Sequence, residues 1–117
     1  MSIETSIIEA LAGIASNHVY PDAAPQDTPL PLVTYKTIDR EPLNTLQGYA
    51  GITRSIIRFD CWAKTKAEAL SLAASVVAAI HAYAGIQNKY QESPGASDYE
   101  PAVDQFVEPV QFTFWHP

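Results

Sequence analysis

The residues from Ile52 to Trp62 alternate between two kinds of side chain, and this period of two constrains the fold more than any other feature. The first set of alternating positions is Ser55, Ile57, Phe59 and Cys61; the second is Arg54, Ile56, Arg58, Asp60 and Trp62. A β-strand points successive side chains to opposite faces of its sheet. We therefore predict a strand here, with the first set in the core and the second set on the outward face.

Two helices are predicted from apolar residues at three- and four-residue spacing. The first runs from about Ile3 to Ser16. The second begins at the capping box Thr65 to Glu68, in which the hydroxyl and the carboxylate each accept from a free backbone N–H. It is expected to end at Gly85 in a left-handed cap. About twenty residues at roughly 1.5 Å each make this helix about 30 Å long, enough to cross a four-stranded sheet.

Prolines crowd the segment from Tyr20 to Lys36, which could be a linker, a ligand for another domain or part of the fold. Its prolines are Pro21, Pro25, Pro29 and Pro31. With 117 residues the chain is expected to form one domain, 1–117, so there is nothing to link. A ligand motif would sit more naturally in a flexible tail. We predict a stiff, ordered segment at the rim of the sheet and near a subunit contact, because residues without an N–H suit an edge.

The remaining strands complete the fold prediction. Strands are expected over Leu32–Ile38, Ile86–Gln91 and Val103–Trp115, the last interrupted by Pro109, and Arg40–Gly51 is expected to be a loop or an irregular hairpin tip. The order helix, strand, strand, helix, strand, strand predicts an α+β fold of two layers. It has a mostly antiparallel sheet of about four strands, with two helices on one face.

Charge is distributed unevenly along the chain. The net charge is −6, which argues against nucleic acid as the main partner. Between Lys36 and Lys66 there are six bases and three acids, whereas Glu92 to Glu108 holds five acids and no base. These regions could meet within the fold, meet between copies in a head-to-tail contact, or be unrelated solvated surfaces.

The sequence offers no arrangement of residues that indicates catalysis. The glycines form no phosphate-binding loop, and the three histidines lack the spacing of zinc ligands. His81 is expected to interact with the end of its helix, and Cys61 to pack in the core rather than act as a nucleophile. Asp104 and Glu108 are read as solvated carboxylates. We predict no catalytic residue, no cofactor, no metal and no enzymatic activity.

The outward row of the strand has the composition of a protein interface, although a solvent face with one tolerated Trp would look the same. A sheet with one open face must also protect its edges, and oligomerisation would do so. The expected interface residues are Arg40, Leu46, Tyr49, Arg54, Ile56, Arg58, Trp62, Asp98, Glu100, Asp104 and Glu108. The segment Ala69–Ile86 is read as a buried helix rather than a membrane span, nothing marks the chain for export, and the lone Cys61 favours a reducing compartment.

Several segments together resemble a known family. They are the first helix, Val19-Tyr20-Pro21, Pro29-Leu30-Pro31 leading into a strand, and Asp60-Cys61-Trp62-Ala63 followed by Ala67-Glu68-Ala69. With the ending "FTFWHP", this pattern is similar to the small tail-completion or tail-terminator proteins of long-tailed bacteriophages and prophages. The likeness runs over nearly the whole chain.

The resemblance implies a structural subunit that caps or completes the tail tube at its head-proximal end, as a ring commonly of six copies. The implied partners are other copies of the chain, the tail-tube protein and head–tail connector proteins, with no specific nucleic acid and no membrane. The implied location is the host cytoplasm during assembly and then the tail or neck of the virion. Two alternatives stay open: a small ligand- or protein-binding module, such as an enzyme accessory domain, and nucleic-acid binding through Arg54 and Arg58.

Overall fold

The structure is a computed structural model that describes residues 3–14, 18–22, 29–84, 88–92, 98–100 and 105–116. The elements are α1 (Ile3–Ala10), β1 (Val19–Pro21), β2 (Leu32–Thr45), β3 (Gly48–Ala63), α2 (Lys66–Ala82), β4 (Asn88–Glu92), β5 (Asp98–Glu100) and β6 (Gln105–His116).

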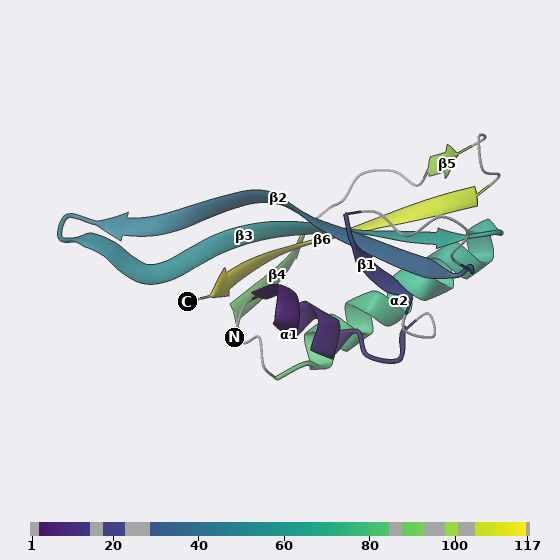
Figure 1. Ribbon diagram of the computed structural model, residues 1–117, viewed down its shortest axis with the longest axis horizontal. Helices are drawn as coiled ribbons and strands as arrows, with labels where there is room; N and C mark the ends of the chain where they lie inside the picture. Colours follow the sequence, from purple (N-terminus) through teal and green to yellow (C-terminus); the bar gives the residue numbers. More distant parts are fainter. Residues whose placement is uncertain are drawn as a thin grey trace.

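The strands form one six-stranded sheet in the order β1-β2-β3-β6-β4, and β5 also pairs with β6 (Figure 1). Every pairing is antiparallel except that of β1 with β2. The predicted α+β class is confirmed. The predicted count of about four strands was too low, because β1 and β5 have three residues each and are too short to show a period.

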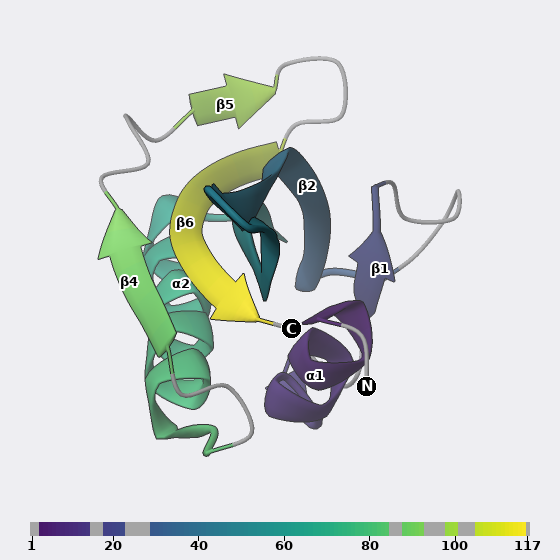
Figure 2. The ribbon, with the colours of Figure 1, turned by 90° about the vertical axis from the view of Figure 1, so that its left-hand side faces the viewer.

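Both helices pack against one face of the sheet, as Figure 2 shows along the long axis. The buried cluster joins Ile3, Ile7 and Leu11 of the N-terminal segment with Leu72, Ala73, Val76 and Ile80 of α2, and with Val33, Tyr35, Ile57, Phe59, Cys61, Val110, Phe112 and Phe114 of the sheet. The Tyr83 hydroxyl also donates to the Glu9 carboxylate at 2.5 Å, which ties the end of α2 to α1. The two-layer arrangement with helices on one face is therefore present.

The helix boundaries differ from the prediction in part. Helix α1 ends at Ala10 instead of Ser16, and the chain turns at Gly13, whose φ of +83° is readily adopted by glycine. Residue 16 itself lies outside the described residues. Helix α2 starts as predicted: the Thr65 side chain accepts from the Glu68 N–H at 3.2 Å. The expected cap at Gly85 lies outside the described residues.

The proline-rich segment begins in a strand at the sheet edge. Strand β1 is parallel to β2, which begins at Leu32. The Asp22 N–H donates to the Tyr35 carbonyl at 2.7 Å, and the Leu30–Pro31 peptide bond is cis. The predicted edge position is confirmed for Pro21, while Pro25 lies outside the described residues.

Strand β6 is central in the sheet and continues through Pro109, so the predicted interruption was wrong. On one side β6 pairs with β3 along most of its length, including Pro109 opposite Asp60. On the other side it pairs with β5 at 105–107 and with β4 at 111–115, and no described strand lies opposite 108–110. Proline, which lacks an N–H, thus falls where one side of the ladder is empty.

Of the two readings for Arg40–Gly51, the loop was wrong, whereas the irregular hairpin tip is present, although the turn itself is confined to Leu46 and Gln47. Strands β2 and β3 extend through this region and make one long hairpin, which projects beyond the helices (Figure 1). The molecule consequently measures 52 × 24 × 24 Å. Few large apolar residues occur between Arg40 and Gly51, so the strands lack the alternating pattern that a buried face would impose.

Candidate functional site

The outer part of the hairpin is two-stranded, and we call residues 42–53 the arm. Strand β6 ends where His116 pairs with Thr53, so beyond this point β2 and β3 pair with no other strand among the described residues. The pairing continues from Pro42↔Thr53 through Asn44↔Tyr49 to Thr45↔Gly48. Since an isolated two-stranded ribbon is only marginally stable in water, a projecting arm of this kind gains stability from a partner.

Local hydrogen bonds and glycines shape the arm. Leu46 and Gln47 connect the two strands, and the Thr45 hydroxyl accepts from the Gln47 N–H and donates to the Gly48 carbonyl, both at 3.2 Å. The register shifts between Pro42 and Asn44, opposite Gly51 with its φ of +83°. Irregularities of this kind bend and twist a hairpin.

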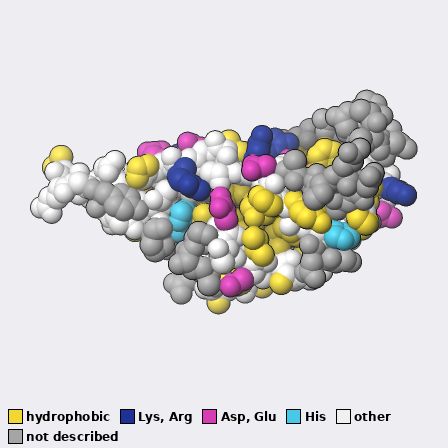
Figure 3. All heavy atoms as spheres, viewed as in Figure 1, with side chains coloured by type: hydrophobic (Ala, Val, Ile, Leu, Met, Phe, Trp, Pro, Cys, Tyr) yellow, Lys and Arg dark blue, Asp and Glu magenta, His cyan; other side chains and the backbone are white. Residues whose placement is uncertain are grey.

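The arm carries no charged residue, and its tip is apolar. The Leu46 side chain is 108% exposed, and Ile52 is 40% exposed. In Figure 3 the arm end, at the far left, is yellow and white, and charged side chains begin closer to the body. The arm thus presents two exposed apolar residues on a projection without charge, and depletion of charged residues is a property of the core of protein interfaces.

Charged side chains instead surround the base of the arm, where they pair within the chain. Arg54 lies 2.9 Å from the Glu41 carboxylate and 3.4 Å from that of Asp39. Arg40 lies 3.8 Å from Glu4 of α1. The arginines expected to meet an acidic neighbour therefore already have acidic partners in the same chain.

The outward row of β3 lies on the open face of the sheet, as the alternation predicted, but it is half-buried. Arg58 contacts Asp60 at 3.0 Å, and the Trp62 indole N–H donates to the Thr34 hydroxyl at 3.2 Å. Ile56 is likewise half-buried. Trp62 is thus held by its neighbours on the sheet.

Glu92 of β4 is held on the same open face. Its carboxylate accepts hydrogen bonds from the Thr113 hydroxyl and, at 2.7 Å, from the Gln111 amide. The hydrogen bond from Thr113, followed by that from Gln111 and the charge of Arg54, lowers the pKa of Glu92 below its ordinary value. Glu92 therefore stays ionised at neutral pH and orders this corner of the sheet.

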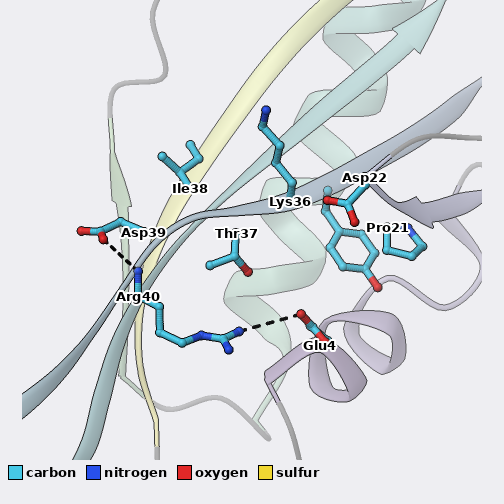
Figure 4. Close-up of a pocket in the computed structure, with 9 residues that line it drawn as sticks. Glu4, Pro21, Asp22, Lys36, Thr37, Ile38, Asp39 and Arg40 are labelled. Carbon is cyan, nitrogen blue, oxygen red and sulfur yellow. Dashed lines mark hydrogen bonds and ion pairs between the residues drawn. The ribbon is translucent and has the colours of Figure 1, made fainter.

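A groove of about 420 Å³ runs along β2 where β1 ends (Figure 4). It is lined by Glu4, Pro21, Asp22, Tyr35, Lys36, Thr37, Ile38, Asp39 and Arg40. Six consecutive β2 residues form its floor, and carboxylates of both α1 and the β1 end lie at its rim. Burial, followed by the charges of Glu4 and Asp22, raises the pKa of Tyr35, so its hydroxyl stays protonated at neutral pH.

The model of one protein family matches residues 5–91, from α1 through both hairpin strands and α2 into β4. That family is described as tail completion protein gp17. The chain belongs to this family. No curated protein matched the sequence.

Family membership gives the chain a structural role in a phage tail, and confirms the resemblance on which the sequence prediction rested. It also implies interaction with other phage tail or head proteins and a location in the virion tail. Across the described ranges, no helix is long and apolar enough to cross a membrane.

The expected interface residues divide into three groups. Arg40, Leu46 and Arg54 lie on the hairpin, and Ile56, Arg58 and Trp62 continue along β3 onto the open face. Glu108 lies directly opposite Cys61 in the β3–β6 pairing, so its side chain is on the helix-covered face of the sheet. The row containing Arg54 and Arg58 is on the opposite face. Asp104 lies outside the described residues, and for Tyr49, Asp98 and Glu100 the structure describes the backbone alone.

The sequence prediction missed Asp39, Glu41 and Ile52. The signal for the two acids was available, because a continuous hairpin would place Glu41 opposite Arg54. It was overlooked because the region was read as a loop or an irregular hairpin tip, with no strand register assigned to it.

Cys61 and His81 are both held in structural positions. Cys61 is 0% exposed, and burial, with smaller contributions from Asp60 and Glu108, raises its pKa to about 12. His81, in the last turn of α2, stacks edge-on against Phe112 and contacts the Gln91 amide oxygen at 3.3 Å. No group of three or more metal-ligating side chains occurs within the ranges that the structure covers.

Proposed function

We propose that this chain, acting as one domain over residues 1–117, forms a ring that completes the tail tube at its head-proximal end. The ring has six copies, as the resemblance implies, and contacts the tail-tube protein and head–tail connector proteins. It assembles in the host cytoplasm and stays in the virion tail or neck, without catalytic activity. The observation that carries this proposal is the uncharged, apolar-tipped arm on a member of a tail-completion family.

The arm supports assembly for a physical reason. A two-stranded ribbon that projects beyond the core leaves backbone groups and apolar side chains exposed, and both are satisfied when the arm contacts a neighbouring protein. In a ring, each subunit uses two different surfaces, one for each neighbour. An elongated subunit with an arm at one end and a helix-covered body at the other offers two such surfaces (Figure 1).

The alternative of a small-ligand module is less well supported by the cavities. The groove along β2 is open and its rim is charged, whereas ligand pockets are mostly apolar with a few polar groups. A second hollow, of about 560 Å³ beside α2, is also open, and Lys64, Glu68, Ser71 and Ser75 line it together with Leu30, Pro31 and Leu72. The alternative of nucleic-acid binding through Arg54 and Arg58 is weakened because both side chains contact carboxylates of their own chain.

Co-sedimentation with assembled tail tubes tests the proposal, using a variant without the arm. Glu41 and Arg54 are direct cross-strand partners, so replacing residues 42–53 by Asn-Gly closes the hairpin with a two-residue turn and keeps the register. We expect the full chain to form rings that pellet with tubes. The shortened chain should keep a cooperative thermal transition and the helical signal of α1 and α2, because the arm contributes nothing to the core cluster, and should not pellet.

Leu70→Ser provides the matched control, because Leu70 is an exposed apolar residue on α2, away from the arm. This variant should pellet with tubes as the wild-type chain does. A wild-type chain that remains monomeric in the presence of tubes would overturn the proposal, and a shortened chain that still completes tubes would overturn the role of the arm.

A further inference from the structure

The outer edge of β2 is uncovered along most of its length. Strand β1 pairs only with Val33 to Tyr35, whereas β2 continues to Thr45. No described strand lies beside Lys36 to Thr45 on this edge. The groove follows the first part of this uncovered edge, from Tyr35 to Arg40 (Figure 4).

The direction of the backbone groups on this edge follows from the bonds to β1. The Val33 N–H donates to the His18 carbonyl at 2.8 Å, and the Tyr35 carbonyl accepts from Asp22 at 2.7 Å. Backbone groups of alternate residues in a strand point to the same side. Thr37, two residues further on, therefore directs its N–H and C=O toward the groove, where a further strand could bind.

A second uncovered edge lies on the opposite side of the same hairpin. Strand β6 reaches only Thr53, so Gly48 to Ile52 of β3 have no described neighbour on their outer side. Neither edge is regular throughout: the register of β2 with β3 shifts between Thr37 and Asp39, the Arg40 N–H donates to the Asp39 carboxylate at 2.9 Å, and Gly51 has a positive φ. A contact with the β2 edge is therefore centred on the outward N–H and C=O of Thr37. The groove is lined by both acidic and basic side chains. Gly48 to Ile52 have no charged side chain, so an added strand of this sequence would introduce no repulsion between like charges.

The geometry points to strand addition between copies: the β3 edge of one subunit, Gly48–Ile52, pairs with the β2 edge of the next, Lys36–Arg40, and lies in its groove. The two edges belong to opposite sides of one hairpin, so the contact is heterologous and can repeat around a ring. Backbone hydrogen bonds supply the attraction, as in other cases of β-strand addition. This inference rests on the proposed ring and names the surfaces that close it.

Disulfide trapping tests the pairing in the full chain. Cys61, the only cysteine, is fully buried, so introduced cysteines report without interference. Thr37→Cys is combined with Ala50→Cys in one double variant and with Ile52→Cys in another, so that more than one register is sampled. Under mild oxidation during ring assembly, at least one double variant should give a ladder of covalent oligomers up to the size of the ring.

Mixtures of single variants provide the control. Thr37→Cys chains mixed with Ala50→Cys or Ile52→Cys chains should give dimers of unlike chains and nothing larger, and each single variant alone should stay uncrosslinked. Dimers formed by Thr37→Cys alone would overturn the inference, because they would show symmetric pairing of two β2 edges. Trapping of Thr37→Cys to the tail-tube protein would overturn it as well.

The backbone role of Thr37 is tested by Thr37→Pro against Thr37→Val. Thr37 directs its N–H away from β3, so proline removes the outward donor without removing a bond of the β2–β3 ladder. We expect Thr37→Val to assemble normally and Thr37→Pro, with an unchanged circular dichroism spectrum, to lose ring formation. Rings that form normally without trapping in either double variant would overturn the strand addition and leave the proposed function intact. Failure of the wild-type chain to form rings would remove the proposed function itself.

Discussion

Cys61 illustrates how its surroundings determine what a side chain does. A reactive thiol needs exposure and positive charge, whereas Cys61 is fully buried and has Asp60 and Glu108 as its charged neighbours. The raised pKa keeps it protonated and inert. A side chain that could have suggested chemistry is therefore part of the packing between sheet and helices.

The raised pKa of Cys61 predicts a loss of stability in alkaline solution. Below about pH 8.5 the thiol is protonated in both the folded and the unfolded state, and its titration has no effect. Between that pH and the folded-state pKa of about 12, only the unfolded chain ionises, so stability falls by up to about 1.4 kcal/mol per pH unit. Urea midpoints at about pH 8 and about pH 10 measure this loss. Cys61→Ala should lose less stability over the same interval, and equal losses in both chains would contradict the assignment.

Glu92 gives a second prediction at a single side chain. Thr113→Val removes the hydroxyl that donates to Glu92 and keeps the shape of the side chain, so the pKa of Glu92 should rise toward its ordinary value. In the wild-type chain the lowered pKa stabilises the fold above the ordinary carboxyl pKa, and this contribution is lost as the pH falls through the folded-state value. Carboxyl titration by NMR measures the shift. Tyr90→Phe, at an exposed position on the same strand, should leave the pKa of Glu92 unchanged.

At the scale of elements, the sequence predicted those whose pattern comes from burial. The alternation of β3 and the cap at Thr65 are local signals that tertiary packing reinforces, and both are confirmed. The length of the hairpin strands beyond Arg40 was not predicted, although an irregular hairpin tip was one reading, because these strands have no buried face there and backbone pairing alone maintains them. Strand β1 was missed because its three residues form a strand only by pairing with Val33 to Tyr35, and this tertiary contact leaves no local pattern in the sequence.

The tip of the arm gives a prediction that separates assembly from stability. Leu46→Asp should change the free energy of unfolding by no more than about 0.5 kcal/mol, because the side chain is fully exposed. If the tip is a central contact, the same change should weaken binding to tail tubes at least about tenfold, or about 1.4 kcal/mol. Leu70→Asp on α2 should leave binding unchanged. Equal effects of the two variants would show that exposed apolar residues in general, and not the arm, drive the association.

For the whole molecule, the distribution of charge changes the expected nature of the subunit contact. The sequence suggested attraction between a basic and an acidic region. In the structure Arg40, Arg54 and Arg58 are each within 4 Å of a carboxylate of their own chain, at 3.8, 2.9 and 3.0 Å. The arm itself is neutral, so contacts through it depend on apolar surface and backbone hydrogen bonds.

Assembly should consequently depend little on salt. Raising the ionic strength from about 0.1 M to about 1 M shortens the Debye length from about 10 Å to about 3 Å and weakens contacts between exposed charges. We expect the fraction of chain that pellets with tail tubes to remain nearly constant over this range. A steep loss of pelleting would instead support attraction between regions of opposite charge.

The position of β6 has a consequence for synthesis of the protein. This strand follows all the other strands that the structure describes, yet it lies between β3 and β4 in the middle of the sheet. As the chain leaves the ribosome, the long hairpin emerges before the strand that covers its inner edge, and until then this edge is open to other chains. A product that ends before Gln105 lacks the strand that joins β3 to β4. Such a product would expose the inner edge of β3 and aggregate instead of folding as a shorter subunit.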